Sequence, residues 1–369
     1  MAFRHLLNLA SDHLTSLPIL ILYLTDGCNS RCVTCDIWRN PRLNMRRELV
    51  EQLVSEVKPL GIRWVVLSGG EAMQHPHWAQ IARRFREAGA RLILLTNGLF
   101  LRKQADDVIA SVDEVVVSLD GGTAATYEAI RGVDAFGLVL EGMAAVHAGG
   151  IPITTRTTLQ RANFAEMPQI IDAAKSVGVD HVSFLTVDVS NPYAFGDREI
   201  PISSIVGATA LPTELHQAIA PEALTPEDCD RLEQIIATLE RTHAAEFTSG
   251  QIAESPDKLR RMLTYFRALL GNGDFPPVRC NAPHTSAVVQ VDGTLRPCYF
   301  LPTMGTVGAS NPSMRTGQRG GAEYSLPLRD AINSDAALGL RHAYRAGERA
   351  ECGRCVCPLY KGTRALIQL

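Results

Sequence analysis

Six apolar segments alternate with amphipathic segments through the first half of the 369-residue chain, and this alternation restricts the folds open to it. The apolar segments have the composition of buried strands and cover residues 18–24, 63–67, 91–95, 114–119, 151–159 and 181–187. Helical spacing of apolar residues is found between them, over residues 48–57, 78–88, 101–111, 135–148 and 167–177. Strands that alternate with helices form parallel sheets with right-handed crossovers, so residues 17–190 are expected to form an α/β fold.

The rest of the chain divides into three further segments. Residues 1–16 are a lead-in that is too short to be a domain. Residues 191–275 begin with a proline-rich irregular stretch, expected to be a lid, a binding loop or a linker, and continue with helices over 228–246 and 257–270. Residues 276–369 differ again, with short strands and a helical stretch over 328–346, and are expected to be a small α+β domain.

Composition argues against two classes of partner. The net charge is −3, so no basic field favours nucleic acid or an anionic membrane surface. The first apolar run, Leu17 to Leu24, is too short to cross a bilayer, and no small-residue cleavage site follows it. We therefore expect a cytoplasmic protein with neither nucleic acid nor membrane among its partners.

Nine cysteines are grouped towards the two ends of the chain. In a large chain without an export signal, such grouping indicates metal or redox chemistry rather than disulfides. The groups are Cys28, Cys32 and Cys35; Cys280 and Cys298; and Cys352, Cys355 and Cys357, with Cys229 alone. Two metal sites would produce this distribution.

The first group, spaced C-x3-C-x2-C, directly follows the first apolar strand. Three thiolates are one short of a closed zinc shell or of a fully protein-ligated cubane cluster. This arrangement resembles the signature of the radical S-adenosylmethionine (SAM) enzymes. The resemblance implies a partial (β/α)6 TIM-like barrel, in which Cys28, Cys32 and Cys35 hold a [4Fe–4S] cluster whose fourth iron binds SAM. Thr34 departs from the family pattern, which often has an aromatic residue there.

Ser68-Gly69-Gly70-Glu71 ends the second strand and resembles the family's GGE motif. The resemblance implies that Gly69, Gly70 and Glu71 bind the SAM amino group through backbone and carboxylate. Glycines let a ligand approach the main chain closely, and a carboxylate accepts hydrogen bonds from an ammonium group. Asn97, after the third strand, is a further candidate SAM contact, although its side chain could equally satisfy a turn.

Ser118 and Asp120 end the fourth strand, and the resemblance implies that they contact the SAM carboxylate and ribose. Without it, the same residues would be an ordinary strand end with an Asp-Gly turn. Arg131, in an Arg-Gly element, could pair with the SAM carboxylate. Arg156 is its rival, because a charged residue in the middle of a strand is costly without a partner.

The C-terminal cysteines resemble the single-cluster twitch form of the SPASM auxiliary domains. Residues 288–297 alternate about Asp292-Gly293 as a β-hairpin, and Gly293-x4-Cys298 matches the G-x4-C element of those domains. The resemblance implies an auxiliary [4Fe–4S] cluster on four thiolates, namely Cys280, Cys298, Cys352 and Cys355. Cys357 could replace Cys355, bind substrate or be inert, and a four-cysteine zinc ribbon is the alternative to a cluster.

The resemblance implies a radical SAM oxidoreductase. Such an enzyme cleaves SAM reductively to a 5′-deoxyadenosyl radical, abstracts a substrate hydrogen and oxidises the substrate radical through the auxiliary cluster. Our leading hypothesis is dehydrogenation or bond formation on a small natural-product or sugar-like molecule, with flavodoxin or ferredoxin as electron donor. Fewer than 20 residues precede the first strand, which favours a small substrate over a peptide. The alternatives are a peptide-modifying maturase and, in another class, a zinc-stabilised binding protein.

Overall fold

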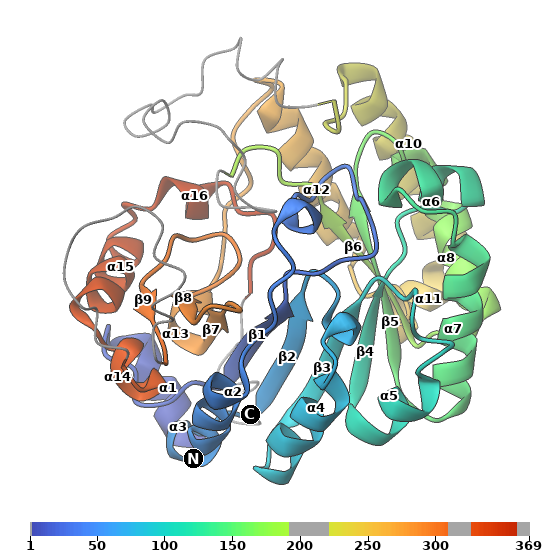
Figure 1. The fold of residues 1–369 in the computed structure, drawn as a ribbon. Coiled ribbons are helices and arrows are strands. Elements are labelled where there is room, and N and C mark those ends of the chain that lie inside the picture. Colours follow the sequence, from blue (N-terminus) through green and yellow to red (C-terminus); the bar gives the residue numbers. More distant parts are fainter. Residues whose placement is uncertain (1, 192–220, 309–325, 360–369) are drawn as a thin grey trace.

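The computed structural model describes residues 2–191, 221–308 and 326–359. All six expected strands are present and each pairs in parallel with the next, which confirms the α/β prediction (Figure 1). They are β1 (Ile19–Thr25), β2 (Trp64–Gly69), β3 (Arg91–Thr96), β4 (Glu114–Ser118), β5 (Ile153–Leu159) and β6 (His181–Thr186). Most of the irregular stretch expected after residue 190 lies outside the described residues.

Helices cover the outer face of these strands. Those that the sequence predicts are α2 (Arg47–Ser55) with α3 (Val57–Leu60), α4 (Trp78–Glu87), α5 (Ala105–Ser111), α7 (Phe136–Ala148) and α8 (Met167–Ser176). Helix α6 (Ala124–Arg131) was not predicted, and local signals mark both of its ends. The Thr123 side chain accepts a hydrogen bond from the backbone N–H of Thr126, and Gly132 ends the helix with φ of 67°. Short 3-10 turns are η1 (Ile37–Arg39), η2 (Ala72–Gln74) and η3 (Phe164–Glu166).

The C-terminal hairpin continues the barrel sheet. Strand β7 (Ser286–Val289) pairs in parallel with β1, and β8 (Thr294–Arg296) and β9 (Gly305–Thr306) follow in antiparallel order. The sheet therefore runs β6-β5-β4-β3-β2-β1-β7-β8-β9. The sequence predicts the hairpin but not this pairing, because the free edge of β1 carries no signal for its partner.

Two predicted helices are each broken in the structure. The stretch 228–246 forms α10 (Pro226–Thr242) and α11 (Ala244–Ser249), and 328–346 forms α14 (Leu328–Ala331) and α15 (Asp335–Arg345). Ser334 begins α15 by accepting a hydrogen bond from the backbone of Ala337, so the helix restarts there. Helix α12 (Pro256–Leu269) is found as expected and packs against α10 and β6.

The N-terminal lead-in packs against the C-terminal region. Helix α1 (Ala2–Ala10) lies on α13 (Ala282–Thr285), where Asn8 Nδ2 donates to the carbonyl of His284 at 3.1 Å. Asp12 forms an ion pair with Arg345 of α15 at 3.0 Å. The short helix α16 (Ala350–Gly353) follows α15 along the chain. These contacts tie the two ends of the chain together beside β7.

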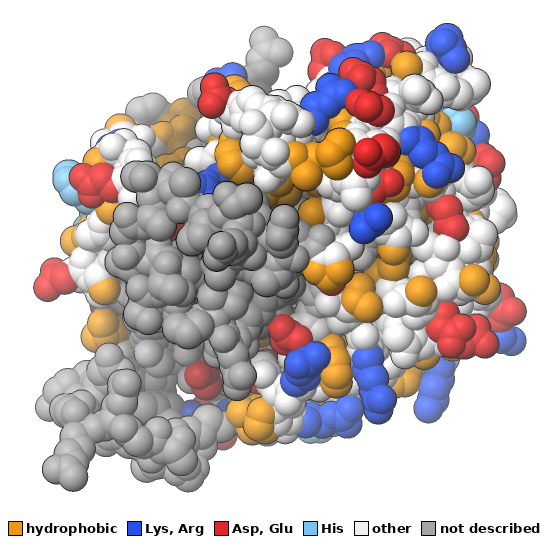
Figure 2. Space-filling model, turned by 90° about the horizontal axis from the view of Figure 1, so that it is seen from above, with side chains coloured by type: hydrophobic (Ala, Val, Ile, Leu, Met, Phe, Trp, Pro, Cys, Tyr) orange, Lys and Arg blue, Asp and Glu red, His pale blue; other side chains and the backbone are white. Residues whose placement is uncertain are grey.

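The visible upper surface carries charged side chains of both signs, interspersed with apolar ones (Figure 2). Within the described part of the chain, no helix is both long enough and apolar enough to span a bilayer.

Successive side chains of a barrel strand point to opposite faces of the sheet. On β5, Ile153, Thr155, Thr157 and Leu159 are buried, and the residues between them are partly exposed. Arg156 is one of the latter, and it faces the hollow side of the sheet where the candidate site lies.

Candidate active site

The cysteine loop is anchored at the carboxyl end of β1. The backbone N–H of Asp26 donates to the carbonyl of Leu43 at 3.0 Å, and Gly27 donates to the Thr25 hydroxyl at 3.0 Å. Cys28, Cys32 and Cys35 are all free, partly buried thiols. Burial is the largest influence on each and raises their pKa values, that of Cys35 to about 12.

The end of α6 holds the cysteine loop in place. The backbone N–H of Arg31 donates to the carbonyl of Arg131 at 3.0 Å, and Val33 donates to Ile130 at 3.0 Å. Gly132 lies so close that a Cβ there would be 2.7 Å from the carbonyl oxygen of Arg31. The Arg-Gly element therefore needs its glycine to dock against the loop.

The two glycines of the GGE motif are also explained by contact with this loop. A Cβ on Gly69 would lie 2.4 Å from the carbonyl oxygen of Thr25, and one on Gly70 would lie 2.4 Å from that of Gly27. Gly70 donates its N–H to Thr25 at 2.8 Å, and Glu71 donates to Gly27 at 2.8 Å. The close approach that requires glycine is therefore made by the chain itself, while SAM binding by Gly69 and Gly70 stays a prediction.

The Glu71 side chain is buried and connects the end of β2 to the end of β3 through hydrogen bonds. Its carboxylate accepts hydrogen bonds from the Asn97 backbone at 2.7 Å, the Thr96 hydroxyl at 2.9 Å and the Met73 backbone at 3.1 Å. Burial raises the pKa of Glu71, although these donors oppose the shift. An ammonium ligand would have to share this carboxylate with three protein donors, so the expected contact with SAM stays a prediction.

Asn97 connects the end of β3 to the cysteine loop. Its side-chain amide donates to Asn29 Oδ1 at 2.7 Å and to Ser30 Oγ at 3.2 Å, and lies 3.8 Å from the sulfur of Cys28. Its own oxygen accepts a hydrogen bond from the backbone of Leu99 at 3.1 Å. The residue orients the loop around Cys28, and a direct contact with SAM stays a prediction.

Asp120 and Arg131 form a buried ion pair. Arg131 Nη1 lies 3.0 Å from Asp120 Oδ2, and the other carboxylate oxygen accepts from the Thr158 backbone at 2.7 Å. Burial lowers the pKa of Arg131, but the charges of Cys32 and Asp120 raise it, and the net shift is upward. Arg131 Nε is buried and has no hydrogen-bond partner in the described structure, so it could donate to an anionic group beside these cysteines.

Ser118 and Arg156 lie opposite each other on β4 and β5 and line the same cavity. Neither side chain makes a hydrogen bond or ion pair within the described ranges, and Arg156 Nε is buried without a partner. The structure therefore separates the two rival arginines. Arg131 already has a carboxylate partner, whereas Arg156 faces the cavity unpaired.

The C-terminal cysteines gather at one end of that cavity. Cys280 precedes α13, Cys298 follows β8, and Cys352, Cys355 and Cys357 lie in and after α16. All five line the cavity as free thiols, and burial raises the pKa of each, that of Cys298 and of Cys352 to about 12. The Tyr344 hydroxyl donates to the carbonyl of Cys280 beside them. Cys229 is buried on α10, away from both groups.

The cysteine groups fit a cluster better than a single ion. Among the described residues, no three His, Cys, Asp or Glu side chains are close enough together to hold one metal ion. A zinc ion draws its thiolates close together, because each Zn–S bond is only about 2.3 Å long. A cubane places each cysteine on a different iron and so holds the thiolates farther apart. The five free thiols of the C-terminal region surround one cavity, an arrangement that suits the larger group.

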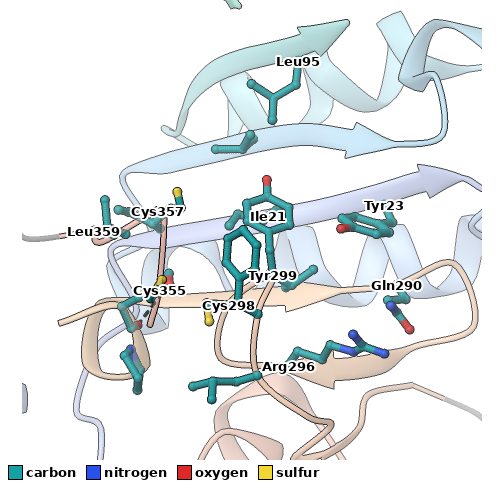
Figure 3. A pocket seen from close by; sticks show the side chains of 18 of the residues that line it. Ile21, Tyr23, Leu95, Gln290, Arg296, Cys298, Tyr299, Cys355, Cys357 and Leu359 are labelled. Carbon is teal, nitrogen blue, oxygen red and sulfur yellow. Dashed lines mark hydrogen bonds between the residues drawn. The ribbon is translucent and has the colours of Figure 1, made fainter. Parts of the chain in front are cut away.

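A cavity of about 1000 Å³ lies on the hollow side of the sheet. Its walls are mainly apolar side chains of β1 to β4, β6 and β7, namely Ile19, Ile21, Trp64, Val66, Ile93, Leu95, Val116, Leu185 and Val288. In Figure 3, Cys298, Cys355 and Cys357 lie at one end, and Tyr23 and Arg296 at the other. Between them is Tyr299, whose ring centroid lies 6.1 Å from that of Tyr23.

Sequence reasoning found Ser118 and Arg156 but missed four other polar residues of this cavity. Tyr23, Gln290, Arg296 and Tyr299 all line it, yet none belongs to a recognised motif. The available signal was the alternation along β1 and the hairpin, which places every second residue on one face. What the sequence could not supply was the pairing of β7 with β1, which brings these side chains together.

Comparisons with known proteins agree with this fold. Residues 22–174 match the model of the radical SAM superfamily. The AdoMet-dependent heme synthase of Methanosarcina barkeri is 32% identical over 199 residues, which are 52% of this chain and 56% of that protein. The PqqA peptide cyclase of Streptomyces rochei is 29% identical over 213 residues, 56% of this chain and 55% of that protein. Each match thus spans about half the length of the curated relative.

Two solved structures share the fold across almost the whole chain. Streptococcus suis SuiB bound to precursor peptide SuiA has a TM-score of 0.61 at 14% identity, covering 97% of this chain and 75% of that chain. Native anSMEcpe with bound AdoMet and Cp18Cys peptide has a TM-score of 0.60 at 15% identity, covering 93% and 89%. The likeness extends beyond residue 174, so the fold of the C-terminal region is shared as well.

Proposed function

This chain carries a radical SAM domain, and on that premise we propose that it is an enzyme that oxidises a peptide substrate by radical chemistry. One observation carries the proposal: the cavity on the hollow side of the sheet borders the cysteine loop through Asp26 and is lined by all five C-terminal cysteines. A substrate in this cavity would lie between two candidate cluster sites.

Cys28, Cys32 and Cys35 would hold one [4Fe–4S] cluster, and Cys280, Cys298, Cys352 and Cys355 a second. When bound, the first supplies the electron that cleaves SAM, and the second accepts an electron from the substrate. The fit of the first site is supported by the Ser30 N–H, which donates to the sulfur of Cys28 at 3.5 Å, and by the unpartnered Nε of Arg131. Both groups stabilise negative charge on sulfur.

Other residues of the site would bind SAM, hold the cysteine loop or exclude water. Ser118 and Arg156, which have no side-chain partners in the described structure, would receive the SAM carboxylate or ribose on the cavity wall. A guanidinium and a hydroxyl together suit a carboxylate. Arg131 and Asp120 hold the cysteine loop against α6 instead. The apolar wall excludes water, which protects a reactive radical from side reactions.

A peptide is favoured over a small molecule by three relatives. The curated relative from Streptomyces rochei is named a peptide cyclase, and SuiB and anSMEcpe were solved with peptides bound. Removal of a hydrogen atom, followed by loss of an electron to the second cluster and of a proton, is a two-electron oxidation, so the product would have lost two hydrogens. A new crosslink or a dehydrogenated side chain would both satisfy this balance.

Oxidation of a small molecule is the second candidate. A cavity of about 1000 Å³ is at the upper limit for a small-molecule site, and the heme synthase relative has a name that indicates such a product. Coexpression of the enzyme with short open reading frames from its own gene neighbourhood separates the two. A peptide that loses the mass of two hydrogens supports the first candidate, and unmodified peptides support the second.

Cleavage of SAM tests the radical chemistry itself. Protein reconstituted with iron and sulfide under argon, then reduced with dithionite, is expected to form 5′-deoxyadenosine from SAM. Cys32→Ala is expected to abolish this product, while Cys229→Ala serves as the matched control because Cys229 is buried on α10. Undiminished product from Cys32→Ala would refute the proposal.

A further inference from the structure

Arg296 carries a charge that nothing in the described structure neutralises. It projects from β8 into the cavity, and its Nε is buried with no hydrogen-bond partner. Within the described residues the guanidinium makes no ion pair either. A partly buried cation without a counter-charge is costly, so a partner is expected when the cavity is filled.

The hairpin places Gln290 on the same face as Arg296. Arg296 pairs with Val288 across the hairpin, and Gln290 follows the last residue of β7 and donates its backbone N–H to Thr294 at 2.9 Å, so the side chains of Arg296 and Gln290 are diagonal neighbours. Figure 3 shows both at the end of the cavity that also holds Tyr23. A guanidinium and a carboxamide therefore present several N–H donors to one region.

Four carboxylates also line the cavity, but none pairs with Arg296 within the described residues. Glu114 forms an ion pair with Arg91 at 3.4 Å, and Glu351 forms one with Arg349 at 2.8 Å. Asp292 accepts a hydrogen bond from the backbone of Thr294 at 2.9 Å and is exposed at the hairpin turn. Asp26 lies in the cysteine loop and forms no ion pair within the described residues. The donors of Arg296 thus remain available to a ligand.

Arg296 and Arg156 act on different parts of the cavity. The positive charge of Arg156 acts to lower the pKa values of Tyr299 and Cys357, whereas the charge of Arg296 acts to lower that of Tyr23; burial outweighs both effects. Arg156 also lies opposite Ser118 on the barrel wall, where the proposed SAM contacts are. Arg296 belongs to the hairpin and is left for the second molecule in the cavity.

We propose that Arg296, with Gln290 beside it, binds a carboxylate of the substrate, and that the peptide carries an acidic residue next to the apolar segment that enters the cavity. The inference rests on the proposed function, since it takes the cavity as the substrate site. A guanidinium donates two parallel hydrogen bonds to the two oxygens of a carboxylate. A neutral amide of the same shape has one oxygen and no charge, so it binds the guanidinium less strongly.

The test compares two fluorescent peptides, Ala-Val-Glu-Val-Ala and Ala-Val-Gln-Val-Ala, by anisotropy with reconstituted protein and SAM. The wild type is expected to bind the Glu peptide roughly tenfold more tightly, as for a hydrogen bond to a charged group. Arg296→Gln is expected to remove the preference and Arg296→Lys to retain part of it. Arg47→Gln, on the outer helix α2, makes the same charge change outside the cavity.

Equal binding of the two peptides by the wild type, or a preference that survives in Arg296→Gln, would overturn the inference. Unchanged iron content and circular dichroism in each variant show that folding is intact, and Arg296→Lys remains informative if Arg296→Gln fails to fold. Formation of 5′-deoxyadenosine is measured separately. A Glu preference in a protein that does not cleave SAM would refute the proposed function while supporting the carboxylate site.

Discussion

Arg131 joins the barrel to the cysteine loop in two ways: its guanidinium lies 3.0 Å from the carboxylate of Asp120, and its backbone carbonyl accepts a hydrogen bond from Arg31 at 3.0 Å. Both charged side chains are nearly buried, with 12% and 5% of their side-chain surface exposed. The pair therefore couples the end of β4 to the loop that carries the first three cysteines.

Loss of one partner of this pair is expected to destabilise the protein strongly. Removing one charge from a buried pair typically costs about 3–5 kcal/mol, because the other is left uncompensated. Arg131→Met and Asp120→Asn should each lower the free energy of unfolding measured by urea titration. The double variant should lose less than the sum of the two. Additive losses would show that the two charges do not interact.

Gly70→Ala is expected to disturb the cysteine loop, because the new Cβ would lie 2.4 Å from the carbonyl oxygen of Gly27. Such overpacking costs about 1–3 kcal/mol. Iron bound after reconstitution should fall together with the melting temperature. Gly137→Ala is the matched control, since a Cβ there meets nothing within 4 Å on helix α7. Equal iron content in both variants would contradict the expectation.

Cys298→Ser is expected to separate the two cluster sites. Two cubanes contain about eight irons, so the variant should retain about four. Cleavage of SAM should persist, because Cys28, Cys32 and Cys35 are untouched, but oxidised product should be lost. Iron analysis and product mass measure the two effects. Loss of SAM cleavage together with the iron would show that the sites are interdependent.

Cys355 and Cys357 compete for the last place on the auxiliary cluster. The Cys355 backbone N–H donates to the carbonyl of Cys352 at 3.4 Å in one turn, whereas Cys357 lies within the field of Arg156. We expect Cys355→Ser to lose the auxiliary iron and Cys357→Ser to keep it. Iron analysis of the two variants, prepared in parallel, distinguishes them. The opposite result would make Cys357 the ligand.

Acid is expected to destabilise the protein through His284. Burial, with help from the positive charges of Arg345 and Arg341, lowers the pKa of His284 to about 4. Between that value and about 6.5 the unfolded chain binds the extra proton, so stability falls as pH drops through this window, by up to about 3 kcal/mol. His284→Gln should flatten the loss of stability, measured by urea titration from pH 7 to pH 4. An unchanged slope would exclude His284 as the cause.

The alternation of apolar strands and amphipathic helices determined the barrel, and the spacing of the first three cysteines determined the loop that it carries. Both are local signals: strand burial appears as a continuous apolar run, and C-x3-C-x2-C fits in one turn of loop. Helix α6 was missed although Thr123 and Gly132 mark its ends, because it has only eight residues and buries only two of them, Tyr127 and Ile130.

The tertiary structure alone decided which side chains share the cavity. Strand β7 joins the free edge of β1 about 260 residues after it along the chain, and that pairing brings Tyr299 to Tyr23 and sets Arg296 against the barrel wall. The tertiary structure also pairs Asp120 with Arg131 and leaves Arg156 without an ion-pair partner among the described residues. Strands as distant in sequence as β1 and β7 are paired by the packing of the whole sheet, and no local pattern of residues records that choice.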